Sequence, residues 1–282
     1  MLLCVDAGNT QIALGLYPDE ADDVHPALVR DWRMRTDPRM TADELEVAFG
    51  ALLGRYAGEV TGVAALSTVP SLLREMRLLI ERRGGPAVVV GPGVRTGVPL
   101  LVDNPREVGA DRVMNTLAAH RLFDTACVVV DFGTSTNIDV VSAKGEFLGG
   151  ALAAGIEISM DALASRAAAL RSVELVAPRS VIGKNTVECL QSGVLYGVAG
   201  QVDGLVRRIL AELGPKAGPV TVLATGGLAP LMCGISDTIT AYVPDLTLIG
   251  LRLTYLRNAR STVVTSGSVN APSGETSGRV AR

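Results

Sequence analysis

The chain opens each of its halves with the same short pattern. Residues 2–10 read Leu-Leu-Cys-Val-Asp-Ala-Gly-Asn-Thr, and residues 128–136 read Val-Val-Val-Asp-Phe-Gly-Thr-Ser-Thr. In both, an apolar run ends in Asp-x-Gly with hydroxyl or amide side chains, and apolar residues then resume. This order predicts two β-hairpins, and their similarity favours two domains of related fold. The alternative is coincidence, because apolar-Asp-x-Gly is a common pattern.

The rest of the chain alternates between helical and strand-like segments, which predicts an α/β protein. A capping-box pattern at Thr41 and Glu44 predicts a helix to about residue 56. We expect further strands at 62–68, 86–90 and 220–224, helices at 70–83, 110–123, 159–171 and 184–213, and a last apolar stretch at 246–256. The predicted domains are therefore 1–115 and 116–256. Residues 257–282 lack any periodicity and are expected to be a disordered tail, with a DNA-binding arm as the alternative.

Composition narrows the chemistry. Only two histidines, His25 and His120, are present among 282 residues, so a histidine-ligated metal or a Ser-His-Asp triad has few candidates. The net charge is -3 and aromatic residues make up 4%, so we expect no nucleic-acid partner. The chemistry is expected to use carboxylates, hydroxyls and backbone amides.

Other features indicate a cytoplasmic protein without a membrane segment. The four cysteines are far apart and form no C-x-x-C pair, as expected for free thiols in a reducing compartment. The N-terminus has no basic region and places Asp6 inside its first apolar stretch, unlike a signal peptide. The longest uncharged window, 217–236, holds four glycines and two prolines, so it predicts a strand, a turn and a following segment.

The two hairpins suit a polyphosphate ligand. Backbone N–H groups and hydroxyls at an Asp-x-Gly turn fit phosphate oxygens, and the carboxylates of Asp6 and Asp131 are placed to hold cations that bridge phosphates. The alternative is two ordinary turns with local hydrogen bonds. The P-loop pattern and a complete G-x-G-x-x-G after a strand are both absent. Gly226 and Gly227 follow a predicted strand and would let the backbone approach a flat ligand such as a nucleoside, or simply form a tight turn.

Asp111 stands at the start of the predicted helix at 110–123, where a carboxylate interacts favourably with the helix dipole. Helix capping alone is the alternative role. Arg112 places a cation beside it, and this pair suits a carboxylate or a phosphate on a substrate.

These motifs, in this order, resemble the type III pantothenate kinase family of the acetate kinase, sugar kinase, Hsp70 and actin superfamily. The resemblance covers most of residues 1–256 and rests on Asp-x-Gly-Asn-Thr at 6–10, Gly-Pro-Gly-Val-Arg-Thr-Gly at 91–97, Asn-Pro-Arg-Glu-Val-Gly-Ala-Asp-Arg at 104–112, Asp-Phe-Gly-Thr at 131–134, Gly-Gly at 149–150, Gly-Lys-Asn-Thr at 183–186, Ser-Gly at 192–193, Tyr-Gly at 196–197 and Ala-Thr-Gly-Gly-Leu-Ala at 224–229.

The resemblance implies two ribonuclease H-like domains around a nucleotide cleft, and transfer of the ATP γ-phosphoryl group to pantothenate, the first step of coenzyme A synthesis. It implies Asp111 as general base, Asp131 as ligand of a monovalent cation (K⁺ or NH4⁺), and Mg²⁺ accompanying ATP, with Asp6 a possible ligand through water. The implied ATP contacts are Asp6, Ala7, Gly8, Asn9, Thr10, Gln11, Ile12, Ala13 and Thr134, and the implied pantothenate contacts are Gly109, Ala110, Asp111, Arg112 and Thr186. A homodimer is also implied.

The sequence departs from the family pattern at three positions. Val102 replaces a frequent Tyr, Asn137 a frequent Thr, and Ala154 a usual Pro. Val102 bears on the acceptor, because that Tyr lies near the substrate. Two other functions therefore stay open, another small-molecule kinase of the superfamily and a catalytically weak ATP-binding regulator.

Overall fold

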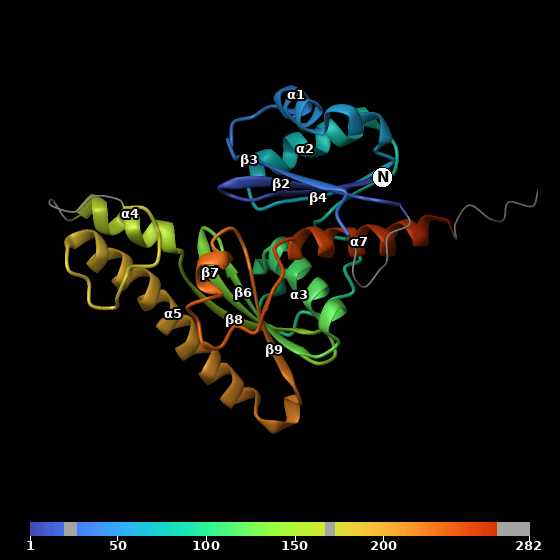
Figure 1. The fold of residues 1–282 in the computed structure, drawn as a ribbon. Helices are drawn as coiled ribbons and strands as arrows, with labels where there is room; N and C mark the ends of the chain where they lie inside the picture. Colours follow the sequence, from blue (N-terminus) through green and yellow to red (C-terminus); the bar gives the residue numbers. More distant parts are fainter. Residues whose placement is uncertain (20–26, 167–172, 264–282) are drawn as a thin grey trace, which may run out of the picture.

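The computed structural model describes residues 1–19, 27–166 and 173–263, and its two five-stranded sheets lie one above the other in Figure 1. The first sheet has the order β3-β2-β1-β4-β5. Its strands are β1 (Leu2–Ala7), β2 (Gln11–Tyr17), β3 (Arg30–Arg35), β4 (Gly62–Ser67) and β5 (Ala87–Val89). Strand β1 pairs antiparallel with β2, as the predicted hairpin requires, and parallel with β4.

Two helices cover one face of the first sheet, α1 (Ala42–Leu53) and α2 (Pro70–Arg83) (Figure 1). The predicted capping box at the start of α1 is confirmed, since the Thr41 side chain accepts from the Glu44 N–H and the Glu44 side chain accepts from the Thr41 N–H. A short 3-10 helix, Gly54–Glu59, then leads into β4. Aliphatic side chains of β1, β2 and β4 pack under both helices to form this core.

The second sheet repeats the plan of the first, with the order β10-β9-β6-β7-β8. Its strands are β6 (Ala126–Phe132), β7 (Ser135–Val141), β8 (Phe147–Ala154), β9 (Val220–Thr225) and β10 (Ala241–Tyr242). Strand β6 pairs antiparallel with β7 and parallel with β9, so the second predicted hairpin is also confirmed. Helices α4 (Ile156–Arg166), α5 (Thr186–Leu213) and α6 (Ala229–Met232) belong to this half.

Helices α3 (Ala110–Phe123) and α7 (Leu246–Val263) lie between the sheets (Figure 1). Residues of both helices share a buried cluster with β1 and β4, and a second cluster with β6 and β9. The last helix of the chain thus packs against its first strand. The predicted boundary between residues 115 and 116 falls inside α3.

Residues 257–263 are helical, although the tail was expected to begin at residue 257. The reason is tertiary. Asn258 donates through Nδ2 to the backbone carbonyl of Arg95 at 3.1 Å, and this contact holds the end of α7 against the segment at 91–98. The remaining tail residues, 264–282, lie outside the described residues, as do residues 167–172 of the predicted helix at 159–171.

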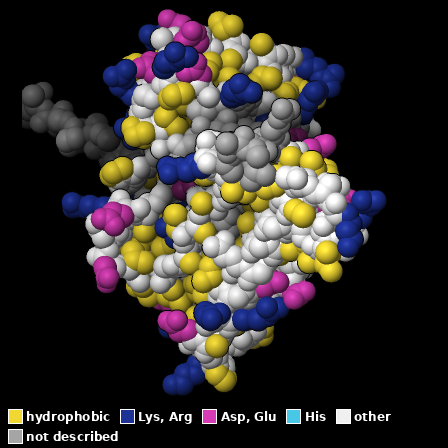
Figure 2. All heavy atoms as spheres, turned by 90° about the vertical axis from the view of Figure 1, so that its left-hand side faces the viewer, with side chains coloured by type: hydrophobic (Ala, Val, Ile, Leu, Met, Phe, Trp, Pro, Cys, Tyr) yellow, Lys and Arg dark blue, Asp and Glu magenta, His cyan; other side chains and the backbone are white. Residues whose placement is uncertain are grey.

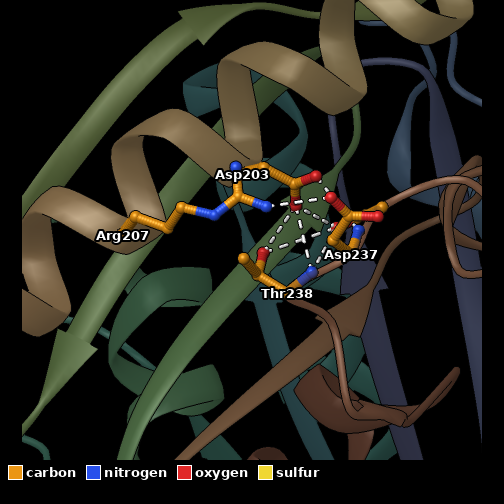
Figure 3. A network of polar contacts seen from close by, with 5 residues as sticks. Asp203, Arg207, Asp237 and Thr238 are labelled. Atoms are coloured by element: carbon orange, nitrogen blue, oxygen red, sulfur yellow. Dashed lines mark hydrogen bonds and ion pairs between the residues drawn. The ribbon is translucent and has the colours of Figure 1, made fainter.

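A buried carboxylate ties α5 to the segment that joins α6 to β10 (Figure 3). Asp203 is 4% exposed and accepts hydrogen bonds from the Ser236 hydroxyl at 2.6 Å, the Asp237 N–H at 3.0 Å, and the N–H and hydroxyl of Thr238 at 3.1 and 2.7 Å. Burial raises the pKa of Asp203, but these hydrogen bonds outweigh it and hold that pKa below its ordinary value.

Within the described residues, no helix is both long and apolar enough to cross a membrane.

Candidate active site

The tips of the two hairpins meet. The hydroxyls of Thr10 and Thr134 are 2.8 Å apart, so the turn after β1 touches the turn after β6. Beside this contact lies a cleft of about 290 Å³. Both hairpins line it, together with the segment at 225–228, the beginning of α3 and the beginning of α7. The structure therefore brings the two repeated motifs to one place, as the phosphate-binding hypothesis requires.

Local hydrogen bonds shape the first turn. The Gly8 N–H donates to the Gln11 carbonyl at 3.0 Å, while Thr36 donates its hydroxyl to the Gly8 carbonyl at 2.7 Å and its N–H to the Thr10 carbonyl at 3.0 Å. The side chains of Asn9 and Thr10 remain exposed along the cleft. Of the predicted ATP contacts at 6–13, all but two line the cleft. The exceptions are Ala7 and Ile12, whose side chains are buried in the first core.

Close backbone packing shapes the second turn. The Gly155 N–H donates to the Thr134 carbonyl at 3.2 Å, and the Leu228 N–H donates to the Phe132 carbonyl at 3.2 Å. Gly226 has a φ of +90°, and a Cβ there would collide with the Asp131 carboxylate and the Phe132 carbonyl. Gly227 has open space around its missing Cβ. The predicted strand and Gly-Gly turn are confirmed, and both glycines line the cleft.

Three carboxylates converge on the cleft, those of Asp6, Asp111 and Asp131. Burial, followed by repulsion from Asp111, raises the pKa of both Asp6 and Asp131 to about 7. Repulsion from Asp131 adds to the shift at Asp6, whereas a hydrogen bond of 3.2 Å from the Asn115 amide opposes the shift at Asp131. Concentrated negative charge of this kind is relieved by a cation.

The chemistry of these residues fits Mg²⁺ or a monovalent cation, because hard cations prefer oxygen ligands. Among the described residues, no group of three or more His, Cys, Asp or Glu side chains is arranged to hold a metal by itself. A cation beside Asp6 or Asp131 would therefore need further oxygens, from water, backbone carbonyls or a phosphate.

Asp111 lies in the first turn of α3, two residues after the N-cap position. Gly109 is the N-cap residue and makes no side-chain cap, and a Cβ on it would collide with the Asp111 carboxylate. The Asp111 side chain instead lines the cleft. Capping alone does not account for its position, and the carboxylate is available for chemistry.

The other four residues predicted to contact the acceptor do not line the cleft. They are Gly109, Ala110, Arg112 and Thr186. Arg112 follows Asp111 and pairs with Asp139 on β7, with its Nη2 2.5 Å from Oδ1. Thr186 is the first residue of α5, and Figure 1 shows the N-terminal end of that helix at the left of the molecule, whereas α3 lies at the centre between the sheets. The Asn185 side chain caps α5 by accepting from the Glu188 N–H at 2.9 Å. Within one copy of the chain, Thr186 and Asp111 are thus separate.

Two buried polar residues near the site escaped prediction. Asn115 lies one turn after Asp111 on α3 and joins Asp131 to α7. Its amide nitrogen donates to the Asp131 carboxylate, and its Oδ1 accepts a hydrogen bond of 2.8 Å from the Thr247 hydroxyl on α7. Asp139, which lies between Ile138 and Val140 on β7, accepts hydrogen bonds from Arg112. The sequence signal that could have found both residues is a polar side chain next to apolar ones, because a buried polar side chain needs a hydrogen-bond partner. The cleft lining also includes Arg33, Thr68 and Glu157.

Solved structures with the same fold identify the class of protein. The chain resembles the activator of 2-hydroxyisocaproyl-CoA dehydratase from Clostridium difficile with bound ADPNP, at a TM-score of 0.53 and 13% identity over 96% of this chain and 99% of that one. It also resembles component A of (R)-2-hydroxyglutaryl-CoA dehydratase from Acidaminococcus fermentans, at a TM-score of 0.54 and 15% identity over 92% and 98%. Together with the repeated sheets, this likeness shows the two-domain fold of the sugar kinase, Hsp70 and actin class.

Sequence comparison then gives the family. The family model for type III pantothenate kinase matches residues 2–208. Type III pantothenate kinases from Saccharopolyspora erythraea, Rhodococcus jostii and Frankia alni are 72%, 64% and 60% identical to this chain. Each alignment covers 92% of this chain and 99%, 96% and 100% of those proteins, respectively. The chain belongs to the type III pantothenate kinase family.

Proposed function

We propose that this protein transfers the γ-phosphoryl group of ATP to the terminal hydroxyl of pantothenate, the first step of coenzyme A synthesis. The carrying observation is the cleft between the two hairpins, whose lining brings together the Asp111 carboxylate at a helix start and the carboxylates of Asp6 and Asp131. Membership in the type III pantothenate kinase family supports the choice of acceptor.

The two hairpin turns bind the phosphates of ATP. Phosphoryl transfer depends chiefly on positioning and on neutralising charge, which backbone N–H groups and hydroxyls at these turns provide. Thr10 and Thr134 approach the nucleotide from opposite sheets, and the 2.8 Å contact between their hydroxyls supports this arrangement. Gly227, which lines the cleft and has open space around its missing Cβ, leaves room for the flat nucleoside.

Asp111 acts as the general base. Its carboxylate accepts the proton of the pantothenate hydroxyl as that oxygen bonds to the γ-phosphorus, and the bond from the γ-phosphorus to the bridging oxygen breaks to release ADP. The position of Asp111 on the cleft supports this role. Gly109, Ala110 and Arg112 help to bind the acceptor beside it.

Asp131 would bind a monovalent cation, K⁺ or NH4⁺, and Asp6 would be a ligand of Mg²⁺ through water. Bound cations supply positive charge that offsets the phosphates. The raised pKa values of both carboxyls support this assignment, because a cation favours their ionised forms.

The active protein is a homodimer in which Thr186 of a second copy completes the acceptor site. Its support is the separation of Thr186 from the cleft, together with exposed apolar side chains on the same half, Leu152, Val181 and Ile182, which are 65–70% exposed. Figure 2 shows hydrophobic side chains gathered on the face that carries α4 and the start of α5.

The domain limits 1–115 and 116–256 stay a proposal, supported by the two sheets and placed with their boundary inside α3. The described cysteines, Cys4, Cys127, Cys189 and Cys233, are free thiols, which supports a cytoplasmic location. Neither nucleic acid nor a membrane is required as a partner.

The proposal is tested by ADP release from the purified protein with ATP and Mg²⁺, with and without pantothenate and with and without K⁺. Release that requires both pantothenate and K⁺ is expected. A panel of sugar and acyl acceptors accompanies it, and turnover with one of these but not with pantothenate would identify another kinase. Binding of ATP with no turnover would identify a regulator.

A further inference from the structure

An ion pair between Arg112 and the buried Asp139 joins the start of α3 to β7. Arg112 donates through Nε and Nη2 to the same oxygen of Asp139, Oδ1, at 2.9 and 2.5 Å. The guanidinium carbon of Arg112 lies 5.1 Å from the centre of the Phe147 ring. The side chain of Asp139 is 1% exposed and that of Arg112 is 20% exposed. Asp139 thus binds one edge of the Arg112 guanidinium, and the Phe147 ring packs against one of its faces.

Burying the charged carboxylate of Asp139 costs free energy, because the carboxylate loses its contacts with water. It lies between Ile138 and Val140 in a buried strand, and its second oxygen, Oδ2, has no hydrogen-bond partner among the described residues. A buried carboxylate is tolerated when a partner of opposite charge is fixed beside it. Replacing such a pair with apolar side chains is often neutral for stability, so the pair needs another explanation.

The chemistry of arginine supplies that explanation. A guanidinium is planar and has five N–H donors in a fixed arrangement, so anchoring two of them determines where the others point. Asp139 takes Nε and one donor of Nη2, and the aromatic ring of Phe147 restricts rotation of the plane. A Cβ built on Gly109 would lie within 4 Å of both Asp111 Oδ1 and Arg112 Cδ, so the two side chains are neighbours at the start of α3.

From this geometry we infer that Asp139 is a positioning residue, which orients the Arg112 guanidinium to bind the phosphoryl acceptor beside Asp111. The inference rests on the proposed function and deepens it, because it adds a residue on the second sheet to an acceptor site otherwise formed by α3. Asp139 touches neither ATP nor acceptor. Its effect is therefore expected in acceptor binding and not in the chemical step.

The experiment compares steady-state kinetics of the full-length wild type with Asp139→Asn, which keeps the shape and removes the charge. The KM for pantothenate should rise about tenfold or more, with kcat and the KM for ATP changing less than about threefold. Asp203→Asn is the matched control, since it removes a buried carboxylate of the same half and should leave the KM for pantothenate unchanged. If Asp139→Asn does not fold, Asp139→Glu retains the charge but displaces the guanidinium and should raise the same KM.

A double-mutant cycle separates positioning from a general structural effect. In an Arg112→Ala background, Asp139→Asn should add less than about twofold to the KM for pantothenate, because its target is gone. Full additivity would overturn the inference, as would an unchanged KM in wild-type background or a KM that falls, since a fall would mean that Asp139 competes with the acceptor. Wild-type protein that neither binds nor phosphorylates pantothenate would overturn the proposed function and this inference together.

Discussion

The most consequential single residue of the cleft is Asp111. Asp111→Asn keeps the size of the side chain but accepts no proton, so kcat should fall by about 10²–10⁴-fold. The Kd for ATP should change little, because the nucleotide contacts are on the hairpins. Single-turnover ADP formation and calorimetric ATP binding measure the two quantities. Glu157→Gln is the control, as another carboxylate of the cleft lining with no assigned role, and near wild-type turnover by Asp111→Asn would contradict the base assignment.

The adjacent residues Gly226 and Gly227 provide a second test of the proposed nucleotide site. Gly226→Ala places a Cβ against Asp131 and Phe132 at a backbone φ of +90°, so it should lower the unfolding midpoint by several degrees and weaken ATP binding. Gly227→Ala meets no atom within 4 Å and should leave the unfolding midpoint within about 1 °C. Its methyl group would reduce ATP affinity only if the nucleoside passes over this turn. Thermal unfolding and nucleotide titration of both variants distinguish strain from lost contact.

At the scale of elements, the attachment of α5 depends on Asp203 (Figure 3). Asp203→Asn cannot accept all four hydrogen bonds and should cost about 2–3 kcal/mol of unfolding free energy at pH 7. Asp237→Asn is a matched control on the same network, since the Asp237 side chain is 77% exposed and pairs with an exposed Arg207. That variant should change stability by less than about 0.5 kcal/mol.

The same carboxylate predicts a pH dependence. Because the folded-state pKa of Asp203 is lowered, its stabilising effect is present above the unfolded pKa of about 3.9 and is lost as pH falls through the lower folded value. The difference in unfolding free energy between wild type and Asp203→Asn should therefore be constant from pH 7 to about pH 5 and shrink below about pH 4. Denaturant titrations at several pH values measure it. A difference that grew on acidification would show that the carboxylate is not stabilised by these bonds.

Elements also differ in how far local sequence specifies them. Helices α2 and α3 match the predicted ranges 70–83 and 110–123, because their boundary signals are local: Pro70 opens α2, Gly84 follows its end, and Gly109 precedes α3. Strands β3 and β8 were not predicted. The first, Arg-Asp-Trp-Arg-Met-Arg, is an exposed edge strand with few apolar residues, and the second is rich in glycine and alanine. Both exist because a neighbouring strand offers backbone hydrogen bonds.

At the scale of the whole molecule, the dimer proposal predicts that assembly and acceptor binding fail together. Ile182→Glu adds charge to a side chain that is 70% exposed, so it should convert a dimer to a monomer and abolish turnover of pantothenate while ATP still binds. Val47→Glu, at a 73% exposed position on α1 in the other half, is the control and should remain a dimer. Sedimentation measures the mass. A wild-type monomer with full activity would contradict the proposal.

The sequence alone determined the two hairpins, the Asp-x-Gly turns at their tips and the helix start that carries Asp111, because each depends on residues only a few positions apart. The tertiary structure decided what those motifs meet. It placed α7 against β1, joined Asn115 to Asp131 and paired Arg112 with Asp139 across 27 residues of chain. Such contacts depend on how two sheets and their intervening helices pack, and no local pattern carries that information. The site is therefore predictable in its chemistry from the motifs, and in its geometry only from the fold.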